Sequence, residues 1–218
     1  MKIIIVFLLI FTSVGLQAQS QTARAAEDLK YLSQKFANDY LFLLYNPNHF
    51  KSRPQLQDTV KNMEEDLRII AKDTRNEDIR SILDYLSYTK DALRDLLHDN
   101  IDRDNAQKVL DDTDSLVEGV DSILQNLQES IFKEELQFHI MKLSKLYMAI
   151  HLQFDPKENT KALYKALHTI DTMMHNINKN IYITWYAYKK LFNPAPHFFI
   201  PHIVTIAVYD LEESINRL

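Results

Sequence analysis

The sequence contains no cysteine and almost no glycine. Without cysteine, the chain can form no disulfide, thiolate metal site, covalent haem attachment or cysteine nucleophile. Gly15 and Gly119 are the only glycines in 218 residues. Phosphate-binding loops, hairpin turns and nucleophile elbows need glycine where the backbone takes a positive φ or closely approaches a ligand. Nucleotide-binding folds, β-sandwiches and α/β-hydrolases are therefore poor fits, and the composition predicts an all-α fold.

The charge balance of the chain is acidic. Its 25 Lys and Arg residues face 30 Asp and Glu residues, which gives a formal net charge of −5. Nucleic acids and anionic membrane surfaces attract basic patches, so we expect no nucleic-acid partner. Acidic runs such as Asp111-Asp112-Thr113-Asp114 are typical of a solvated helix surface.

The N-terminus has the three parts of a secretory signal peptide. Lys2 supplies a positive charge, an apolar run extends from Ile3 to Phe11, and Ala18 is a small residue suited to a cleavage site. The run is shorter than the ~20 apolar residues that a membrane span needs. An uncleaved N-terminal anchor is the alternative interpretation. We expect cleavage near Ala18, a mature chain that begins at or close to Gln19, and a periplasmic or secreted protein.

Apolar residues recur at helical spacing along nearly the whole chain. Capping-box spacings mark three helix starts, at Ser52-Arg53-Pro54-Gln55, Thr74-Arg75-Asn76-Glu77 and Asp155-Pro156-Lys157-Glu158. The apolar stripe slips near Ser130, so residues 105–153 form either two helices or one long helix with a phase shift. The other predicted helices cover residues 22–45, which end before Pro47, then residues 180–192, and a last helix from residue 201.

The two halves of the chain resemble one another. Leu32-Ser33 with Phe36 matches Leu143-Ser144 with Tyr147, and an Asn-Pro or Asp-Pro pair follows in each half. Any two amphipathic helices share periodic leucines, which is the alternative explanation. We predict a helical bundle of two tandem four-helix modules, with a signal peptide over residues 1–18, a first module over 19–130 and a second, divergent module over 131–218.

No metal, cofactor or catalytic site is evident in the sequence. His168, Asp171 and His175 share one side of a helix, but two turns separate the histidines by about 10 Å, too far for one ion without another helix. The Glu-x-x-His pair of di-iron bundles does not occur. Serine, histidine and aspartate residues are present without a catalytic motif. We therefore expect a protein that is not an enzyme.

The densest aromatic segment lies between Ile181 and Phe192. Aromatic side chains all round a helix exceed what one core-facing stripe needs. Neighbouring helices could enclose this segment, or it could line a ligand groove or partner surface, where Tyr and Trp are enriched. The candidate partner-surface residues are Trp185, Tyr186, Tyr188 and Phe192.

Residues 29–41, Leu-Lys-Tyr-Leu-Ser-Gln-Lys-Phe-Ala-Asn-Asp-Tyr-Leu, resemble the opening helix of the PilJ-like family. This family is the N-terminal sensing domain of type IV pilus methyl-accepting chemotaxis proteins, and it is related to the periplasmic domain of nitrate/nitrite sensor kinases. The likeness covers about residues 22–130, with a weaker echo over 131–192. The positions that fit the family pattern are Leu32, Ser33, Gln34, Lys35, Ala37 and Tyr40.

The resemblance implies a periplasmic four-helix sensor bundle, paired with a second copy through its first helix, and ligand-binding roles for Lys30, Ser33 and Gln34. Lys30 stands where the family has an anion-meeting arginine, and Met141 stands there in the second half. Lysine lacks the planar fork of arginine, so we expect no nitrate recognition. No signalling domain follows in this sequence, so a sensory role would require an inner-membrane receptor or a chemotaxis protein as partner.

Two functional hypotheses follow from these patterns. The first is a periplasmic helical sensor or binding module that takes a small ligand or a membrane-receptor partner. The alternative is a structural or assembly protein of the cell envelope that acts through helix–helix contacts.

Overall fold

A computed structural model describes residues 2–48, 52–127, 132–175, 177, 179–195 and 199–217, and within these it leaves out the side chains of residues 2–20, 52 and 73. The described residues form eight α-helices, one short 3-10 helix and no strand, which confirms the predicted all-α bundle. The helices are α1 (Lys2–Tyr45), α2 (Ser52–Asp73), α3 (Glu77–Leu96), α4 (Arg103–Leu127), α5 (Phe132–His151), α6 (Pro156–Met174), α7 (Lys179–Tyr188), the 3-10 helix η1 (Lys189–Phe192) and α8 (Pro201–Asn216).

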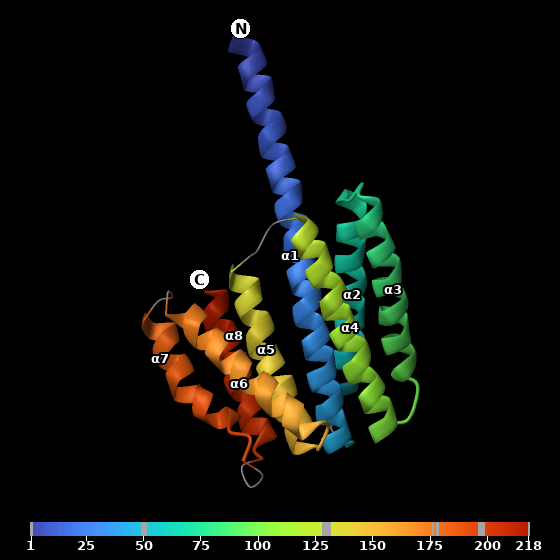
Figure 1. The fold of residues 1–218 in the computed structure, drawn as a ribbon, viewed down its shortest axis with the longest axis vertical. Helices are drawn as coiled ribbons and strands as arrows, with labels where there is room; N and C mark the ends of the chain where they lie inside the picture. Colours follow the sequence, from blue (N-terminus) through green and yellow to red (C-terminus); the bar gives the residue numbers. More distant parts are fainter. Residues whose placement is uncertain are drawn as a thin grey trace.

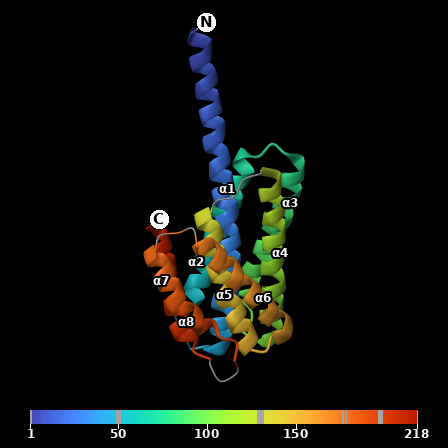
Figure 2. The same ribbon diagram turned by 60° about the vertical axis from the view of Figure 1, so that its left-hand side comes forward.

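The predicted signal peptide, residues 1–18, lies outside the residues whose side chains are described. Helix α1 begins at Lys2, earlier than the predicted residue 22, and its first turns run clear of the other helices in both ribbon views (Figures 1 and 2). Among the side chains of α1 that the structure describes, which start at Gln21, the first buried one is Thr22. Within the described part of the chain, no helix is both long and apolar enough to cross a membrane. The signal peptide and its cleavage stay predictions.

Helix α1 is the centre of the bundle, because α2, α4 and α5 all pack against it (Figure 1). A helix with neighbours on several sides buries most of its circumference, so its apolar residues form more than one stripe. The described α1 side chains that are fully excluded from solvent are Ala23, Ala26, Leu29, Ser33, Phe36, Ala37, Tyr40 and Leu41.

The helices contact one another in two groups. In the first, α2 packs between α1 and α3, and α4 packs between α3 and α1. In the second, α6 packs between α5 and α7, and α8 packs between α7 and α5. Leu32 and Leu143 are both buried, as equivalent positions in two modules would be. The tandem repeat and the division at residue 130 stay predictions, since these contacts do not establish that the groups superpose.

Several helices begin or end at or near the proline and capping residues from which their bounds were predicted. Helix α1 ends at Tyr45, two residues before Pro47. At the start of α6, the side chain of Asp155 accepts a hydrogen bond from the backbone N–H of Glu158 at 3.4 Å, and Pro156 takes the first helical position. Pro201 likewise begins α8, where its missing N–H costs no helical hydrogen bond.

Three predicted boundaries need correction or completion. The cap of α3 is Asn76 and not Thr74: Asn76 has extended backbone angles, and its Oδ1 accepts a hydrogen bond from the N–H of Asp78 at 2.8 Å. The helix predicted over 180–192 is α only to Tyr188 and then tightens into η1. Residues 105–153 contain two helices, α4 and α5, with residues 128–131 between them outside the described residues.

Gly119 marks the close approach of α3 to α4. A Cβ atom at this position would lie 2.6 Å from Cδ2 of Leu86, a fully buried side chain of α3. Glycine is a poor residue for a helix interior. Its place in α4 is explained by the packing of Leu86 over the bare backbone.

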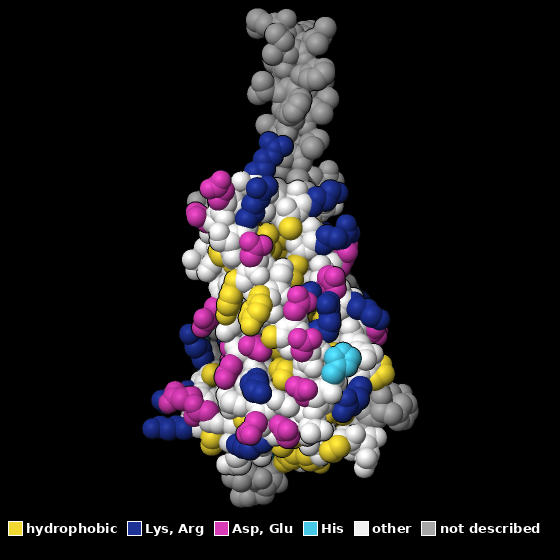
Figure 3. Space-filling view, turned by 90° about the vertical axis from the view of Figure 1, so that its right-hand side faces the viewer, with side chains coloured by type: hydrophobic (Ala, Val, Ile, Leu, Met, Phe, Trp, Pro, Cys, Tyr) yellow, Lys and Arg dark blue, Asp and Glu magenta, His cyan; other side chains and the backbone are white. Residues whose placement is uncertain are grey.

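The side of the bundle on which α3 lies carries a mixed surface (Figure 3). Acidic and basic side chains alternate over this face, so neither sign of charge dominates it. Tyr85 and Tyr88 of α3 are exposed, at 50% and 75% of their full area. Single exposed aromatic residues are normal on a protein surface.

Candidate functional site

Lys30 lies in α1 with its charge neutralised by two carboxylates. Its Nζ is 2.8 Å from Oδ1 of Asp121 in α4 and 3.4 Å from Oε2 of Glu27. The same nitrogen lies 4.5 Å from the ring centroid of Phe138 in α5. Lys30 also lines a cavity of about 320 Å³ between α1, α4, α5 and α6. This buried lysine ties three helices together.

Ser33 and Gln34, the other two residues that the resemblance singles out, are buried in α1. The hydroxyl of Ser33 donates to the carbonyl of Leu29 at 2.7 Å, so its donor is satisfied within the helix. Gln34 is 1% exposed, and its Oε1 accepts no hydrogen bond from the described residues. Of these three residues, Lys30 alone lines the 320 Å³ cavity.

The four aromatic candidates divide between core and surface. Trp185 and Phe192 are fully buried, and the indole Nε1 of Trp185 donates to Oδ1 of Asp171 at 2.7 Å. Tyr186 is 53% exposed, and the hydroxyl of Tyr188 donates to Asp210 of α8 at 2.6 Å. Trp185 and Phe192 therefore help to hold the second group of helices together. Tyr186 and Tyr188 are the two members of the set that a partner could reach.

The side chain of Asp171 holds neighbouring segments of this fold together. Besides accepting from Trp185, it forms an ion pair with Lys189 at 3.2 Å. Among the described residues, no three His, Asp or Glu side chains are grouped as ligands for a metal ion.

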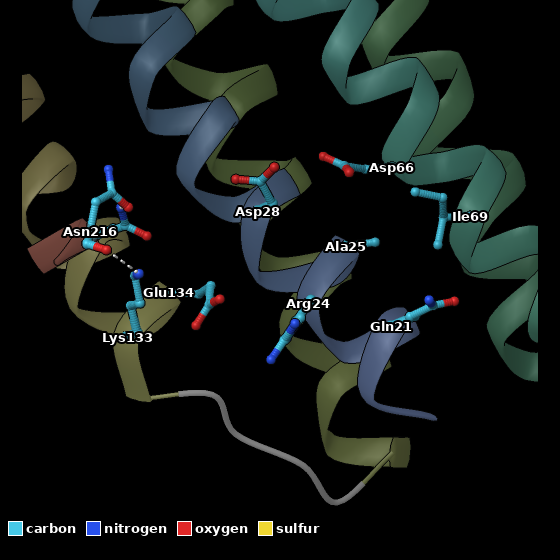
Figure 4. A pocket seen from close by; sticks show the side chains of 10 residues that line it. Gln21, Arg24, Ala25, Asp28, Asp66, Ile69, Lys133, Glu134 and Asn216 are labelled. Carbon is cyan, nitrogen blue, oxygen red and sulfur yellow. Dashed lines mark hydrogen bonds between the residues drawn. The ribbon is translucent and has the colours of Figure 1, made fainter. Parts of the chain in front are cut away.

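A larger pocket, of about 570 Å³, lies where α1, α2, α5 and α8 meet (Figure 4). We call it the Asp66 pocket. Helix α1 supplies the middle of the pocket through residues three or four apart, and α2 and α5 flank it on either side (Figure 4). The lining residues are Gln21, Arg24, Ala25, Asp28, Asp66, Ile69, Lys133, Glu134, Gln137 and Asn216.

Asp66 is the unusual residue of this pocket. It is only 7% exposed, and no hydrogen-bond donor in the described part of the chain reaches its Oδ2. Its carboxyl group points toward that of Asp28 on α1 (Figure 4). Burial raises the pKa of Asp66 from its ordinary 3.8 to about 8, and the negative charges of Asp28 and Glu65 add to this increase.

Two further acids extend the negative potential of the pocket. Burial raises the pKa of Asp28, and the charge of Glu134 on α5 raises it further. Oε2 of Glu134 is also buried and receives no hydrogen bond from the described residues. Asp66, Asp28 and Glu134 thus form an electrostatically linked row from α2 across α1 to α5.

The basic residues of the pocket do not neutralise this row. Nζ of Lys133 donates to the backbone oxygen of Asn216 at 3.1 Å, near the C-terminal end of α8. Cations commonly satisfy the last carbonyl groups of a helix in this way. The side chain of Arg24 points away from the carboxyl groups of Asp28 and Asp66 (Figure 4).

Buried polar atoms in folded proteins nearly always have a hydrogen-bond partner, and an exception calls for an explanation. Asp66 is not among the site residues predicted from the sequence, although its position in the apolar pattern of α2 marks it as unusual. The core-facing residues of α2 include Met63, Leu67 and Ile70, and Asp66 lies three residues after Met63 on the same side. An acid at the edge of an apolar stripe is the sequence signal that could have identified it.

A smaller pocket, of about 200 Å³, lies near the other end of α1, between α1, α2 and α8. Its acid, Asp39, is paired with Lys35 one turn earlier. Exposed apolar residues of α8 border it, among them Ile206 at 64% and Tyr209 at 41% exposure. Because Lys35 neutralises Asp39, this pocket has no unbalanced negative charge like that of the Asp66 pocket.

No protein-family model matches the sequence, and no curated protein or solved structure matches the chain. The geometry and charge of the Asp66 pocket are the features of the molecule that bear on its function.

Proposed function

We propose that this chain is an exported helical sensor or binding module of the PilJ-like kind, which takes a small ligand in the Asp66 pocket. The observation that carries the proposal is the buried carboxyl of Asp66, whose Oδ2 has no hydrogen-bond donor among the described residues. The pocket volume of about 570 Å³ falls within the range of roughly 300–1,000 Å³ that small-molecule sites occupy.

The position of the pocket suits a sensor, because both groups of helices line it. Helices α1 and α2 belong to the first group, while α5 and α8 belong to the second. We propose that the two groups of helices can take more than one position relative to each other. A ligand that contacts both groups, and that binds one of these arrangements more tightly than another, increases the population of that arrangement. We propose that a membrane receptor reads this change, since the described helices include none that could cross a membrane.

We propose that the pocket binds its ligand and does not catalyse a reaction. Among the residues that the structure describes, the ten that line the pocket include carboxylates, amides, a lysine and an arginine, but no serine, threonine, histidine or tyrosine. A carboxylate that acts as a general base needs a nucleophile or reacting group held beside it.

A thermal-shift screen tests the proposed function. A compound that binds only the folded protein raises its melting temperature. Replacing half-buried Ile69 by tryptophan places an indole in the pocket and should abolish the shift. Ile183→Trp, at an exposed position on α7, is the matched control and should keep it. Stabilisation that survives in Ile69→Trp would contradict a site in this pocket.

One observation favours the alternative, a structural or assembly role. Ile203, Ile206 and Tyr209 of α8 expose apolar area at successive turns, which is the kind of helix face that docks another helix. A photo-crosslinking amino acid at position 206 tests it in the exporting cell. A defined product from position 206, with none from position 88 on exposed α3, supports docking through α8. Equal products from both positions, or no product, would count against it.

A further inference from the structure

We infer that the Asp66 pocket recognises an organic ammonium compound, whose N–H groups bind between the carboxyl groups of Asp28 and Asp66. This inference rests on the proposed function, because it names the ligand class of the same site. It goes beyond the resemblance to the PilJ-like family, which points to Lys30 and to anions.

The two carboxyl groups come from neighbouring helices, Asp28 from α1 and Asp66 from α2. The carboxyl of Asp66 is directed toward α1 and Asp28, and that of Asp28 stands out from α1 into the pocket (Figure 4). Asp66 is more than nine-tenths buried, and Oδ2 finds no donor in the described residues. Asp28 is exposed and can be hydrated, so Asp66 is the acceptor that lacks a donor. An ammonium group carries several N–H donors, and it can bind Asp66 and Asp28 together in charge-assisted hydrogen bonds.

The charges of the pocket exclude an anionic ligand. An anion between Asp28 and Asp66 would meet two carboxyl groups, with Glu134 beside them. The two cations of the lining do not offset these acids: Lys133 is bonded to the carbonyl of Asn216, and Arg24 is directed away. A cation is therefore the ligand that the charges of the pocket favour.

The size and lining of the pocket favour an organic cation over a metal ion. Metal ions take several oxygen or nitrogen ligands at about 2.0–2.6 Å. In the described part of the chain, no group of three acidic or histidine side chains has this arrangement. The pocket also has apolar walls at Ala25 and Ile69, and its volume of about 570 Å³ is many times that of one ion. An alkyl chain that carries amino groups fits both features.

Glu134 gives the ligand a second place to bind. Its Oε2 is buried without a hydrogen bond from the described residues, and its charge acts on Asp28. A compound with two or more amino groups can therefore bind between Asp28 and Asp66 with one group and reach Glu134 with another. Spermidine, a flexible triamine, is the probe that we choose.

A proton competes with the ligand for Asp66. The charged groups that line or act on this site are Arg24 and Asp28 on α1, Glu65 on α2, and Lys133 and Glu134 on α5. Since the pKa of Asp66 is about 8, its carboxyl is mostly protonated at neutral pH. Ammonium binding requires the ionised form. Affinity should rise with pH up to about 8, and binding at neutral pH should release a proton.

Isothermal calorimetry with spermidine, on the protein purified as exported, tests the inference at low salt near pH 9 and near pH 6. We expect one binding site, at least tenfold weaker binding near pH 6, and at least tenfold weaker binding in Asp66→Asn. Asp28→Asn should weaken binding as well. Asp84→Asn removes an exposed acid of α3 and should leave the affinity unchanged. Asparagine has nearly the shape of the protonated Asp66 side chain, and Asp28 is exposed, so both variants should fold, and melting curves verify this.

Three results would overturn the inference: no binding of spermidine near pH 9 at about 1 mM, equal affinity in Asp66→Asn and wild type, or tighter binding of glutarate or Mg²⁺ than of spermidine. The thermal-shift screen separates these failures from failure of the proposed function. Compounds that stabilise wild type but not Ile69→Trp would show that the pocket binds a ligand of another class. Spermidine binding lost in both Asp66→Asn and Ile69→Trp supports the site and the ligand class together.

Discussion

The hydroxyl of Ser144 in α5 donates a hydrogen bond to Oδ1 of Asn38 in α1, at 3.0 Å, and both side chains are buried. The bond joins the central helix of the first group to the first helix of the second group. Lys30 and Phe138 meet at the same interface, closer to the start of both helices. The two helices therefore run parallel, side by side, and polar as well as apolar contacts fix their register.

Replacing Ser144 by alanine should lower the free energy of unfolding by about 1–3 kcal/mol, because it leaves the amide oxygen of Asn38 buried without this donor. Urea unfolding measures the change. Ser81→Ala is the control, since Ser81 is an exposed serine whose hydroxyl bonds within its own helix. Equal stability of the two variants would show that the α1–α5 interface does not depend on this bond.

The second prediction concerns Asp66 and pH. Its folded pKa of about 8 lies above the ordinary 3.8, so between these values the folded protein holds a proton that the unfolded chain has lost. The stability that this group contributes is therefore fully present below about pH 4 and is lost as the pH rises through 8. Asp66→Asn should match wild type near pH 4 and be more stable by roughly 2–4 kcal/mol near pH 9.

Urea unfolding of wild type and Asp66→Asn across this pH range measures the effect. The pKa of Glu212 is also raised, to about 7, by its burial, but Glu212 is common to both proteins and cancels in the difference. Asp84→Asn should show no pH-dependent gain. A constant difference between Asp66→Asn and wild type would mean that Asp66 titrates normally.

The third prediction concerns nitrate. Nζ of Lys30 is paired with Asp121 at 2.8 Å and with Glu27 at 3.4 Å, so an anion would have to displace a carboxylate. Lysine also lacks the bidentate geometry of arginine. Calorimetry should detect no nitrate or nitrite binding tighter than about 1 mM. Micromolar binding that disappears in Lys30→Ala would show that Lys30 does preserve anion recognition.

The fourth prediction concerns export. Thr22 is the first buried residue among the described side chains of α1, so a chain that starts near Gln19 keeps every described core residue. Intact-mass analysis of the exported protein should show loss of residues 1–18. The mature form should melt cooperatively, since it retains this described core. Retention of Met1 to Ala18 in the exported protein would contradict the signal peptide.

Much of the fold could be predicted from the sequence, because helix periodicity and end signals are local. Pro47 and Pro156 mark helix boundaries that the structure confirms. The cap at Asn76 was misplaced because Thr74 and Asn76 both suit an N-cap, and the backbone angles decide between them. No glycine or proline separates α4 from α5 in the sequence, so their division into two helices became clear only from the structure.

The candidate site was much less predictable. The Asp66 pocket is lined by residues of α1 and α2 together with residues of α5 and α8, which lie far along the sequence from them, and no local motif marks this meeting. The aromatic residues illustrate the same limit. Trp185 and Tyr186 are neighbours in sequence, yet one is fully buried and the other is 53% exposed, because α7 turns a single face to its neighbours.

The most direct test of the central claim is a crystal structure of the exported protein with the compound that raises its melting temperature most. We predict that this compound lies in the Asp66 pocket, with a donor group between the carboxyl groups of Asp28 and Asp66. A compound seated elsewhere, against α8 or in the cavity beside Lys30, with the Asp66 pocket empty, would contradict it.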